Sequence, residues 1–538
     1  MRLRSDLTGL TLDRITHFWQ VKTMFRAFLS LQILFCFQML MADRPNILYI
    51  MTDDHSYQTY AAYGGPLKDI VKTPNLDSIA NEGMRFDRCY VTNSLCGPSR
   101  ATILTGKHSH ANGFYANSRG QVFDGSQTTF PKVLQANGYQ TALVGKWHLV
   151  SHPTGFDFWE IQQGQGLYYN PIFIGMDGKK FRRQGYNSDL VVDRALWWLK
   201  EKRDPSKPFM LMVHFKGVHS EWHPALRHAN MYDNVKFPLP ETFYDDYKTR
   251  GSAARNQEMT IAKHMEDYRL ILDAPPNSMS PEEKQIWREK FAEKDAKFLE
   301  GNPSGKELIE RKYQRYMQNY CATLAGVDEN VGRLLDFLKQ NGLDENTVVI
   351  YTSDQGFYMG EHGWFDKRFM YEESFRTPLA IRWKGVVKPN SKTDALVQNL
   401  DFAETILDIA GCPIPEEMQG ISFKAILQND GKVPSDWRKS LYYHYYEWPA
   451  IHMVMRHDGV IMGSEKLLEF YPIGEREYYD LSDDPNELNN RISDPSKAKR
   501  VEILSKELKR LREFYKVPEA DKYEPELLKS ALKEKYGK

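Results

Sequence analysis

The sequence lacks the cysteine patterns that would indicate a disulfide framework or a zinc site. Five cysteines are scattered over 538 residues, and none belongs to a C-x-x-C pair. A disulfide-rich fold and a Cys-ligated zinc site are therefore not expected. An excess of one charge is also lacking, because 71 Lys and Arg residues balance 71 Asp and Glu residues. This balance argues against a general nucleic-acid-binding protein, but it allows an anionic ligand in a locally positive pocket.

The chain also lacks a comfortable membrane span near its N-terminus. The apolar run at residues 27–40 is short for a bilayer. Arg26 precedes this run and Ala42 stands before polar sequence, which is the order of a secretory signal. We therefore expect Met24 to be the true start, residues 1–42 to be an over-extended start plus signal peptide, and the mature protein to be exported without a stable membrane span. An uncleaved anchor is the alternative.

The apolar content is sufficient for a large core. With 41% apolar residues in 538, one large α/β domain and a smaller one are the simplest organisation. Residues 225–305 are rich in charge and proline, and they predict an insertion of loops and short helices over the pocket. Helical spacing predicts core helices at 308–340 and 401–409. Four apolar runs have the length of buried parallel strands, at residues 46–51, 139–144, 209–215 and 347–352.

The last part of the chain predicts a second, smaller unit. Short strand-like runs follow Pro434, and residues 504–515 have the pattern of an amphipathic helix. We expect the large domain over residues 43–433, the smaller one over 434–517 and a charged tail over 518–538.

Carboxylates and an amide follow two of the predicted strands. Asp53 and Asp54 come shortly after the first apolar run, and Asp354 and Gln355 come shortly after the last. Ligands bind at the carboxyl ends of parallel strands, so neighbouring strands would bring these four side chains together. An all-oxygen set suits a hard cation, with Ca²⁺ favoured over Mg²⁺. A turn or helix cap explains one Asp equally well, but two adjacent carboxylates less well.

Basic side chains follow the other two strands. Lys146 and His148 come after the run at 139–144, and His219 comes after the run at 209–215. Lys367 lies in a glycine-rich loop that follows Gln355. A surface or core role is the more frequent one for any single Lys or His. Four strands that end alike favour one common site, because loops at strand ends usually carry function.

Cys96 begins a short segment that reads as a turn followed by a helix. Gly97 and Pro98 favour a tight turn, and Ser99 is a candidate N-cap with Arg100 beside it. A thiol at a helix N-terminus near a cation ionises readily and acts as a nucleophile. The alternative is a buried, inert cysteine.

Together these segments resemble the type I, formylglycine-dependent sulfatases of the alkaline phosphatase superfamily. Cys96-x-Pro98-x-Arg100 resembles the family signature, and the segments at 44–54, 145–148, 352–367 and 479–489 are similar to its other elements. Gln355 departs from the Asn or His of many members, although its carbonyl can still bind a cation. The resemblance implies a large, mixed and mostly parallel sheet sandwiched by helices, with a smaller C-terminal antiparallel sheet plus helix.

The resemblance also implies sulfate-ester hydrolysis. Cys96 would be oxidised to formylglycine by a maturation enzyme, and the hydrated aldehyde would attack sulfur. Ca²⁺ would be held by Asp53, Asp54, Asp354, Gln355 and residue 96. Lys146 and Lys367 would offset the charge of the sulfate group. His219 would protonate the leaving oxygen, His148 would orient the hydrate, and Arg100 would hold the turn.

The expected substrate is a sulfated carbohydrate, cleaved from the chain end at a 6-O-sulfate of an N-acetylglucosamine-type sugar. The stretch at 153–171 and the loop at 364–368 resemble bacterial N-acetylglucosamine-6-sulfatases. Asp366 and Arg368 flank Lys367 and would bind sugar hydroxyls. A structural ion pair between them is the alternative. Other candidates for sugar contact are aromatic side chains and two histidines of the smaller domain, namely Tyr168, Tyr169, Trp222, His452 and His457.

Two other functions remain open at this point. A phosphate or phosphonate monoester hydrolase of the same superfamily uses a similar cation and nucleophile. A secreted glycan-binding protein without turnover would need only an unmodified Cys96.

Overall fold

The computed structural model describes residues 44–118, 120–272, 274–519 and 525–537. The predicted start and signal peptide at 1–42 lie outside the described residues, so both stay predictions. Among the helices of the described residues, none combines the length and apolar composition that a membrane crossing needs.

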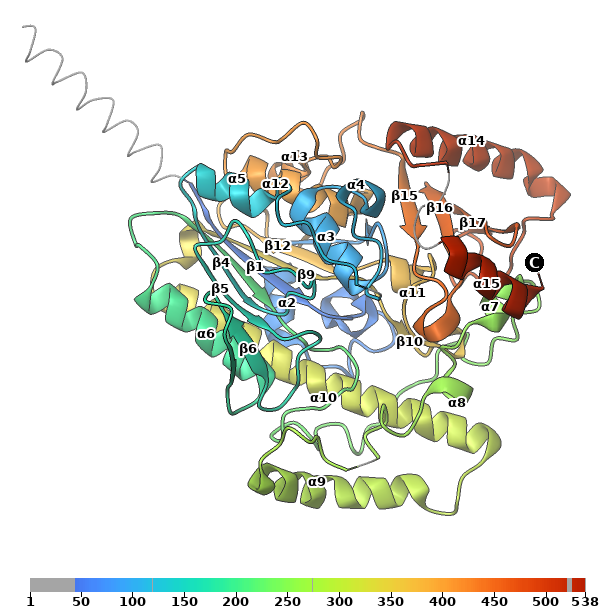
Figure 1. Cartoon of the computed structure of the whole chain (residues 1–538), viewed down its shortest axis with the longest axis horizontal. Coiled ribbons are helices and arrows are strands. Elements are labelled where there is room, and N and C mark those ends of the chain that lie inside the picture. The colour runs from blue at the N-terminus through green and yellow to red at the C-terminus, as the bar shows by residue number, and fades with distance from the viewer. Residues whose placement is uncertain (1–43, 119, 273, 520–524, 538) are drawn as a thin grey trace, which may run out of the picture.

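A ten-stranded sheet forms the centre of the molecule, with strand order β13-β2-β12-β9-β1-β8-β4-β5-β6-β7 (Figure 1). The four apolar runs predicted as strands lie side by side in it, because β1 pairs in parallel with both β9 and β8, and β8 pairs in parallel with β4. The outer strands β12, β6 and β7 run antiparallel to their inner neighbours. The predicted mixed, mostly parallel sheet is therefore confirmed. Its central strands are β9 (Thr347–Ser353), β1 (Asn46–Thr52), β8 (Phe209–His214) and β4 (Gln140–Gly145), and its outer strands are β13 (Ser391–Thr393), β2 (Met84–Phe86), β12 (Leu379–Arg382), β5 (Phe158–Gln162), β6 (Ile172–Gly175) and β7 (Lys180–Arg182).

Helices cover both faces of this sheet (Figure 1). Strand β1 is buried along its whole length, and its alternate side chains enter two different cores. Leu48 and Ile50 pack on one face, whereas Ile47 and Tyr49 pack on the other. This double burial explains why the central strands are continuously apolar. The first face is covered by α2 (Pro74–Asn81), α6 (Asn187–Glu201) and α10 (Gly305–Gln340), and the second by α3 (Cys96–Thr105), α5 (Phe130–Ala136), α12 (Phe402–Ile409) and α13 (Lys424–Gln428).

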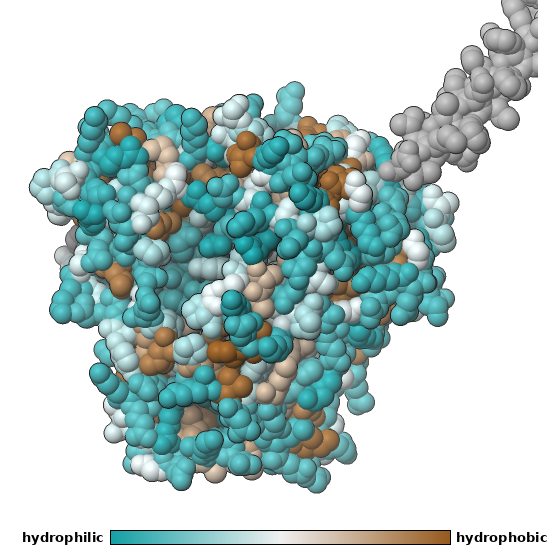
Figure 2. Space-filling view, turned by 180° about the vertical axis from the view of Figure 1, so that it is seen from behind, coloured by the Kyte–Doolittle hydropathy of each residue, from teal (hydrophilic) through white to brown (hydrophobic). Residues whose placement is uncertain are grey.

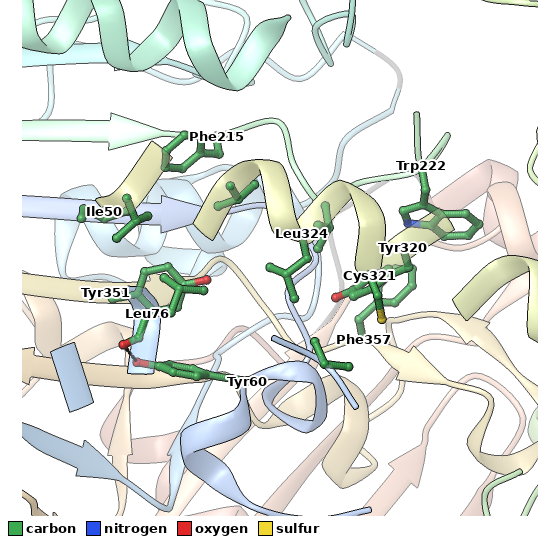
Figure 3. Packing of buried hydrophobic residues seen from close by; sticks show 14 of the residues in the cluster. Ile50, Tyr60, Leu76, Phe215, Trp222, Tyr320, Cys321, Leu324, Tyr351 and Phe357 are labelled. Carbon is green, nitrogen blue, oxygen red and sulfur yellow. Dashed lines mark hydrogen bonds between the residues drawn. The ribbon is translucent and has the colours of Figure 1, made fainter. Parts of the chain in front are cut away.

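The 36-residue helix α10 is the longest element of the described chain. Its buried stripe includes Tyr320, Cys321 and Leu324, which lie against the sheet core around Ile50 (Figure 3). The hydroxyl of Tyr320 donates to the backbone oxygen of Asp54 at 2.8 Å and accepts from the backbone N–H of Ser56 at 3.0 Å. The predicted core helix is thus confirmed, and it also supports the chain just after β1.

A second sheet, separate from the first, contains four antiparallel strands near the C-terminus. Helix α14 (Ala498–Phe514) packs on it through Leu504, Leu508 and Leu511. The predicted antiparallel sheet plus helix is therefore confirmed. The strands are β15 (Ser440–Tyr445), β16 (His457–Met462), β17 (Glu465–Phe470) and β18 (Glu475–Asp480).

Two helices differ from the sequence prediction. The insertion contains α7 (Ser252–Asn256) and α8 (Ile261–His264), but also the 19-residue helix α9 (Pro281–Leu299), which begins with a capping box between Ser280 and Glu283. The charged tail contains α15 (Pro525–Tyr536), and Leu528, Leu532 and Tyr536 pack against the core beside the second sheet. In both segments a short apolar stripe lies among many charged residues, so the sequence pattern did not predict α9 or α15. The surface seen from behind is mostly hydrophilic, with small separate hydrophobic groups (Figure 2).

Replacement of Leu324 by alanine is expected to lower the free energy of unfolding by about 2–5 kcal/mol, because a fully buried side chain leaves a cavity against the central sheet. Urea denaturation followed by tryptophan fluorescence measures this change. Leu299→Ala is the matched control, since Leu299 is 62% exposed on α9 and should change the midpoint little. Equal midpoints for the two variants would contradict the packing role of α10.

Candidate active site

The acidic side chains after β1 and β9 meet at the carboxyl edge of the sheet. The parallel register places Thr52 opposite Ser353, so the next residues of both strands are neighbours. Carboxylate oxygens of Asp53, Asp54 and Asp354 lie within 4.8 Å of one another, and all three side chains are buried. The backbone N–H of Asp54 donates to Asp354 Oδ1 at 3.2 Å. The predicted acidic cluster is therefore formed by strand pairing.

Each of these carboxylates forms its shortest ion pair with a different buried cation. Arg100 holds Asp354 Oδ2 with two donors, Nε at 3.0 Å and Nη2 at 2.8 Å. Lys146 Nζ donates to Asp53 Oδ2, and Lys367 Nζ donates to Asp54 Oδ1. Arg100 Nη1 also donates to the backbone oxygen of Lys146 at 2.9 Å. Arg100 therefore positions two other members of the cluster.

The charges of this cluster are strongly coupled. Burial raises the pKa of Asp54 to about 6, and burial together with Asp53 raises the pKa of Asp354 to about 6. Burial alone would also raise the pKa of Asp53, but Lys146, His219 and Arg100 hold that pKa well below its usual value. Buried carboxylates at such spacing favour additional positive charge.

The donor set fits a hard cation. Asp53 Oδ1 and Gln355 Oε1 are buried, and neither has a hydrogen-bond partner in the described chain. Gln355 Nε2 instead donates to Asp54 Oδ1, and it lies 3.8 Å from Cys96 Sγ. Carboxylate and amide oxygens are the ligands that Ca²⁺ and Mg²⁺ prefer, and no residue of the described chain donates to Asp53 Oδ1 or Gln355 Oε1. Asp53, Asp54, Asp354 and Gln355 could therefore hold a cation beside residue 96.

Cys96 is the first residue of α3 and is fully buried. Two expectations about this segment were wrong. Leu95 is the N-cap residue, whereas Ser99 lies inside the helix, where its hydroxyl donates to the backbone oxygen of Asp354. The thiol is not easily ionised, because burial, with Asp53 nearby, raises the pKa of Cys96 to about 12. The helix N-terminus does not overcome the loss of solvent around the sulfur.

The two histidines predicted for the site differ in their environment. The Nδ1 atom of His219 lies at hydrogen-bond distance from the carbonyl oxygen of Ser220, so it carries the proton and leaves Nε2 toward Asp54 Oδ2 at 3.9 Å. His219 Nε2, Cys96 Sγ and an Asp53 oxygen form a second close group. His148 is half-buried, and its Nδ1 has no hydrogen-bond partner in the described chain.

The loop after Gln355 brings Asp366, Lys367 and Arg368 beside the cluster. Arg368 Nη1 donates to Asp366 Oδ1, so the ion pair considered from the sequence is present. The other carboxylate oxygen of Asp366 lies 3.2 Å from His452 Nε2. His452 is held by its Nδ1, which lies 2.7 Å from the backbone oxygen of Glu258. Of the two histidines expected from the C-terminal part, His452 therefore lies beside this loop.

Three other predicted sugar contacts are not at the site. His457 is fully buried, and both ring nitrogens meet the backbone, at Met455 O and at the N–H of Met370. Trp222 lies in the core, where its ring contacts that of Tyr316. Figure 3 shows Trp222 beside α10. Tyr169 is buried in a cluster with Trp287. Tertiary packing removes all three side chains from solvent.

The C-terminal sheet contacts this loop, and the sequence pattern did not predict that contact. Lys466 of β17 is fully buried and bonds Glu372 Oε1 at 2.7 Å, Glu487 Oε1 at 3.0 Å and the backbone oxygen of Met370 at 3.1 Å. Tyr443 of β15 donates to the backbone oxygen of Arg368. Lys367 itself contacts Asp54, which follows β1 of the central sheet, and the loop that carries Lys367 is held by Tyr443 and Lys466 of the C-terminal sheet.

Gln165 was also missed. Its Oε1 accepts a hydrogen bond from Lys146 Nζ, which is the same ammonium that pairs with Asp53. The only sequence signal is its place between Gly164 and Gly166 in a stretch noted for its resemblance to relatives.

Two family models match this chain, and together they span residues 45–514. The sulfatase family model matches residues 45–412, and the model of the N-sulphoglucosamine sulphohydrolase C-terminal region matches residues 360–514. The chain is 47% identical to the N-acetylglucosamine-6-O-sulfatase of Bacteroides thetaiotaomicron over 505 residues, which cover 90% of this chain and 89% of that protein.

Solved structures show the same likeness. The structure of BT4656 in complex with its substrate D-glucosamine-2-N,6-O-disulfate has a TM-score of 0.86 and 47% identity, covering 89% of this chain and 100% of that one. A phosphonate monoester hydrolase from Silicibacter pomeroyi shares the fold, with a TM-score of 0.65 over 87% of this chain and 95% of that one, but only 21% identity. The family model covers most of the chain, and a relative is nearly half identical over most of both lengths, so the chain belongs to the sulfatase family of sulfuric ester hydrolases.

Proposed function

We propose that this sulfatase acts from the chain end on carbohydrates and removes the 6-O-sulfate of an N-acetylglucosamine-type sugar. The contact between Asp366 and His452, directly beside Lys367, is the observation that carries this proposal. Together with Arg368, which supplies N–H donors, these side chains offer acceptors for sugar hydroxyls next to the cations that would bind the sulfate. The name of a 47% identical relative, the N-acetylglucosamine-6-O-sulfatase of Bacteroides thetaiotaomicron, supports the same sugar and position.

Binding of the sulfate group would rest on Lys146 and Lys367. Both ammonium groups are buried at the same edge of the sheet, where a weakly solvated charge acts strongly on an anion. His219 would face the leaving oxygen through Nε2, because its Nδ1 proton is engaged by the Ser220 carbonyl. His219 is the proposed proton donor, for which Nε2 would have to gain a proton during turnover, because burial lowers the pKa of His219 well below its usual value and leaves the ring neutral. His148 is the proposed orienting residue.

Two groups would complete the site. Ca²⁺ held by Asp53, Asp54, Asp354 and Gln355 would supply positive charge against the sulfuryl oxygens. Formylglycine derived from Cys96 would supply a hydrated aldehyde as the nucleophile. Arg100 keeps Asp354 oriented for this role. We also propose a formylglycine-generating maturation enzyme as a partner and export of the protein, whose signal would lie outside the described residues.

The first test concerns residue 96. Peptide mass spectrometry of active protein is expected to find formylglycine in place of Cys96, and Cys96→Ala should abolish sulfate release. Cys96→Ser should abolish it too, unless the host also oxidises serine. Cys412→Ala is the control, because Cys412 lies near Arg44 at the opposite, amino-terminal end of β1. Active enzyme that carries only a thiol at residue 96 would contradict the proposal.

The second test concerns the cation. Ca²⁺ at a hundredfold excess over its dissociation constant should stabilise the protein by about 2.7 kcal/mol, measured as a rise in the thermal midpoint. In Asp53→Asn this rise should disappear, and sulfate release should fall by roughly a hundredfold because charge stabilisation is lost. Asp177→Asn, at a 58% exposed side chain, should behave as wild type. A full Ca²⁺ response in Asp53→Asn would show that the cation is held elsewhere.

The third test concerns the sugar. Wild type is expected to release sulfate from a 6-sulfated N-acetylglucosamine in preference to 2-, 3- and 4-sulfated sugars and to the matching phosphate ester. Asp366→Ala should lower kcat/KM on the 6-sulfate by roughly ten- to a hundredfold, as expected for a lost hydrogen bond to a charged group. Asp177→Ala is the control. A preference for another position, or an Asp366→Ala enzyme as active as wild type on every sugar, would refute this assignment.

A further inference from the structure

Four lysines are buried in the described chain, and three of them pair with a carboxylate. Lys146 meets Asp53, Lys367 meets Asp54 and Lys466 meets Glu372. Lys216, which is only 5% exposed, is the exception. Its ammonium lies 4.7 Å from the centre of the Tyr168 ring.

An aromatic ring does not replace an anion for a buried ammonium. Among the described residues, no hydrogen bond or ion pair involves the Lys216 side chain, so its three donors lack an acceptor there. A buried cation without a partner is costly, and the face of one tyrosine offsets only part of that cost. Burial, with Lys146 nearby, lowers the pKa of Lys216 to about 8, so the charged form still predominates at neutral pH. An unpaired cation of this kind is suited to an anion that comes from solution.

The backbone ties Lys216 to the active site. The residue follows β8, where the N–H of Asp53 donates to Gly217 O at 3.1 Å and the N–H of Val218 donates to Asp53 O at 2.7 Å. The N–H of His219 donates to the backbone oxygen of Lys216 at 3.0 Å, so one turn carries both side chains. The buried rings of Phe215 and Trp222 anchor the segment on either side (Figure 3).

A cavity of about 790 Å³ opens at this turn, and we call it the Lys216 cavity. It reaches the proposed sulfate site at two points, because His219 lines it and Gln165, another lining residue, accepts a hydrogen bond from Lys146. The volume exceeds that of a sulfate group and falls within the range of ligand pockets. The residues used in this argument are Gln165, Tyr168, Arg182, Lys216, His219 and Glu221.

The charge of the Lys216 cavity favours an anion. Arg182 adds a second cation at the exposed side. The carboxylate of Glu221 is turned to His223, with Oε2 at 3.7 Å from Nε2. Among the described residues, the Lys216 ammonium therefore has no direct carboxylate partner in this cavity. Asp53, Glu221 and Asp54 act on it only from beyond ion-pair distance.

We propose that the Lys216 cavity is a subsite for a second anionic group of the substrate, bound by Lys216 next to the sulfate that is removed. The inference rests on the proposed sulfatase function and narrows its substrate class to glycans with at least two negative groups close together. A single ammonium is a point charge, which suits a sulfate, a sulfamate or a carboxylate. The second anion could belong to the same sugar or to its neighbour, and the experiment separates these two sources.

Two pairs of matched substrates test the subsite. The first pair is 6-sulfated glucosamine with an N-sulfo or an N-acetyl group, which changes the charge on the same sugar. The second pair is a 6-sulfated glucosaminide linked to a uronate or to a neutral sugar, which changes the charge on the neighbour. In at least one pair, wild type should favour the doubly charged member by roughly tenfold in kcat/KM, as expected for one hydrogen bond to a charged group.

Variants of Lys216 test whether this residue causes the preference for the doubly charged substrate. Lys216→Met should bring the preference ratio close to one, while Lys216→Arg should keep most of it. Lys179→Met, at an 83% exposed side chain, is the matched control and should keep the wild-type ratio. The pair in which the ratio collapses identifies the sugar that carries the second anion. Thermal midpoints of all variants show whether the fold is retained.

Two results would overturn the subsite. One is a wild-type enzyme without preference in either pair, and the other is a Lys216→Met enzyme with an unchanged ratio. Calorimetry then gives the ratio of dissociation constants for each substrate pair, measured with Cys96→Ala protein with and without Lys216→Met. The subsite is thereby tested independently of turnover, whereas wild type that releases no 6-sulfate would refute the proposed function instead.

Discussion

Opposite charges buried at one edge of the central sheet are the interaction on which the site depends. Asp53, Asp54 and Asp354 face Lys146, Lys367 and Arg100 in a region without solvent. The loss of water is offset only if every charge keeps a partner, so the removal of one member leaves a costly unpaired charge. The acidic side chains come from two neighbouring strands, and each cation comes from a different segment. The surrounding fold therefore keeps these oppositely charged groups within contact distance of one another.

Polar groups at strand ends were predictable because their signal is local. A continuous apolar run followed by carboxylates identified β1 and β9, and the rule for parallel sheets placed Asp53 and Asp354 together. The roles of His452 and His457 were not separable in the same way. His452 lies shortly before β16 and His457 begins it, and only the tertiary packing decides that His457 is enclosed while His452 reaches Asp366.

Errors at other positions have the same physical origin. Ser99 has a good N-cap residue type, but the helix begins three residues earlier at Cys96. The thiol beside Arg100 suggested easy ionisation, yet the cost of burying a thiolate dominates. Lys216 looks ordinary in the sequence, since nothing near it in the chain reveals that it is buried without an anion. Burial is a property of the assembled molecule, so residue type alone does not predict it.

The contact of Lys466 with Glu372 and Glu487 couples the second sheet to the loop that contains Lys367. The two matching family models overlap over residues 360–412, the stretch that contains Lys367 and the loop that the C-terminal sheet supports. The basic groups proposed to act on sulfur follow strands of the central sheet or, like Lys367, lie in this loop, whereas Asp366 of the same loop meets His452 from the C-terminal part. A substitution in the second sheet that moves this loop would therefore shift Asp366 and Lys367 together, because Tyr443 and Lys466 hold the backbone of the loop that carries both side chains.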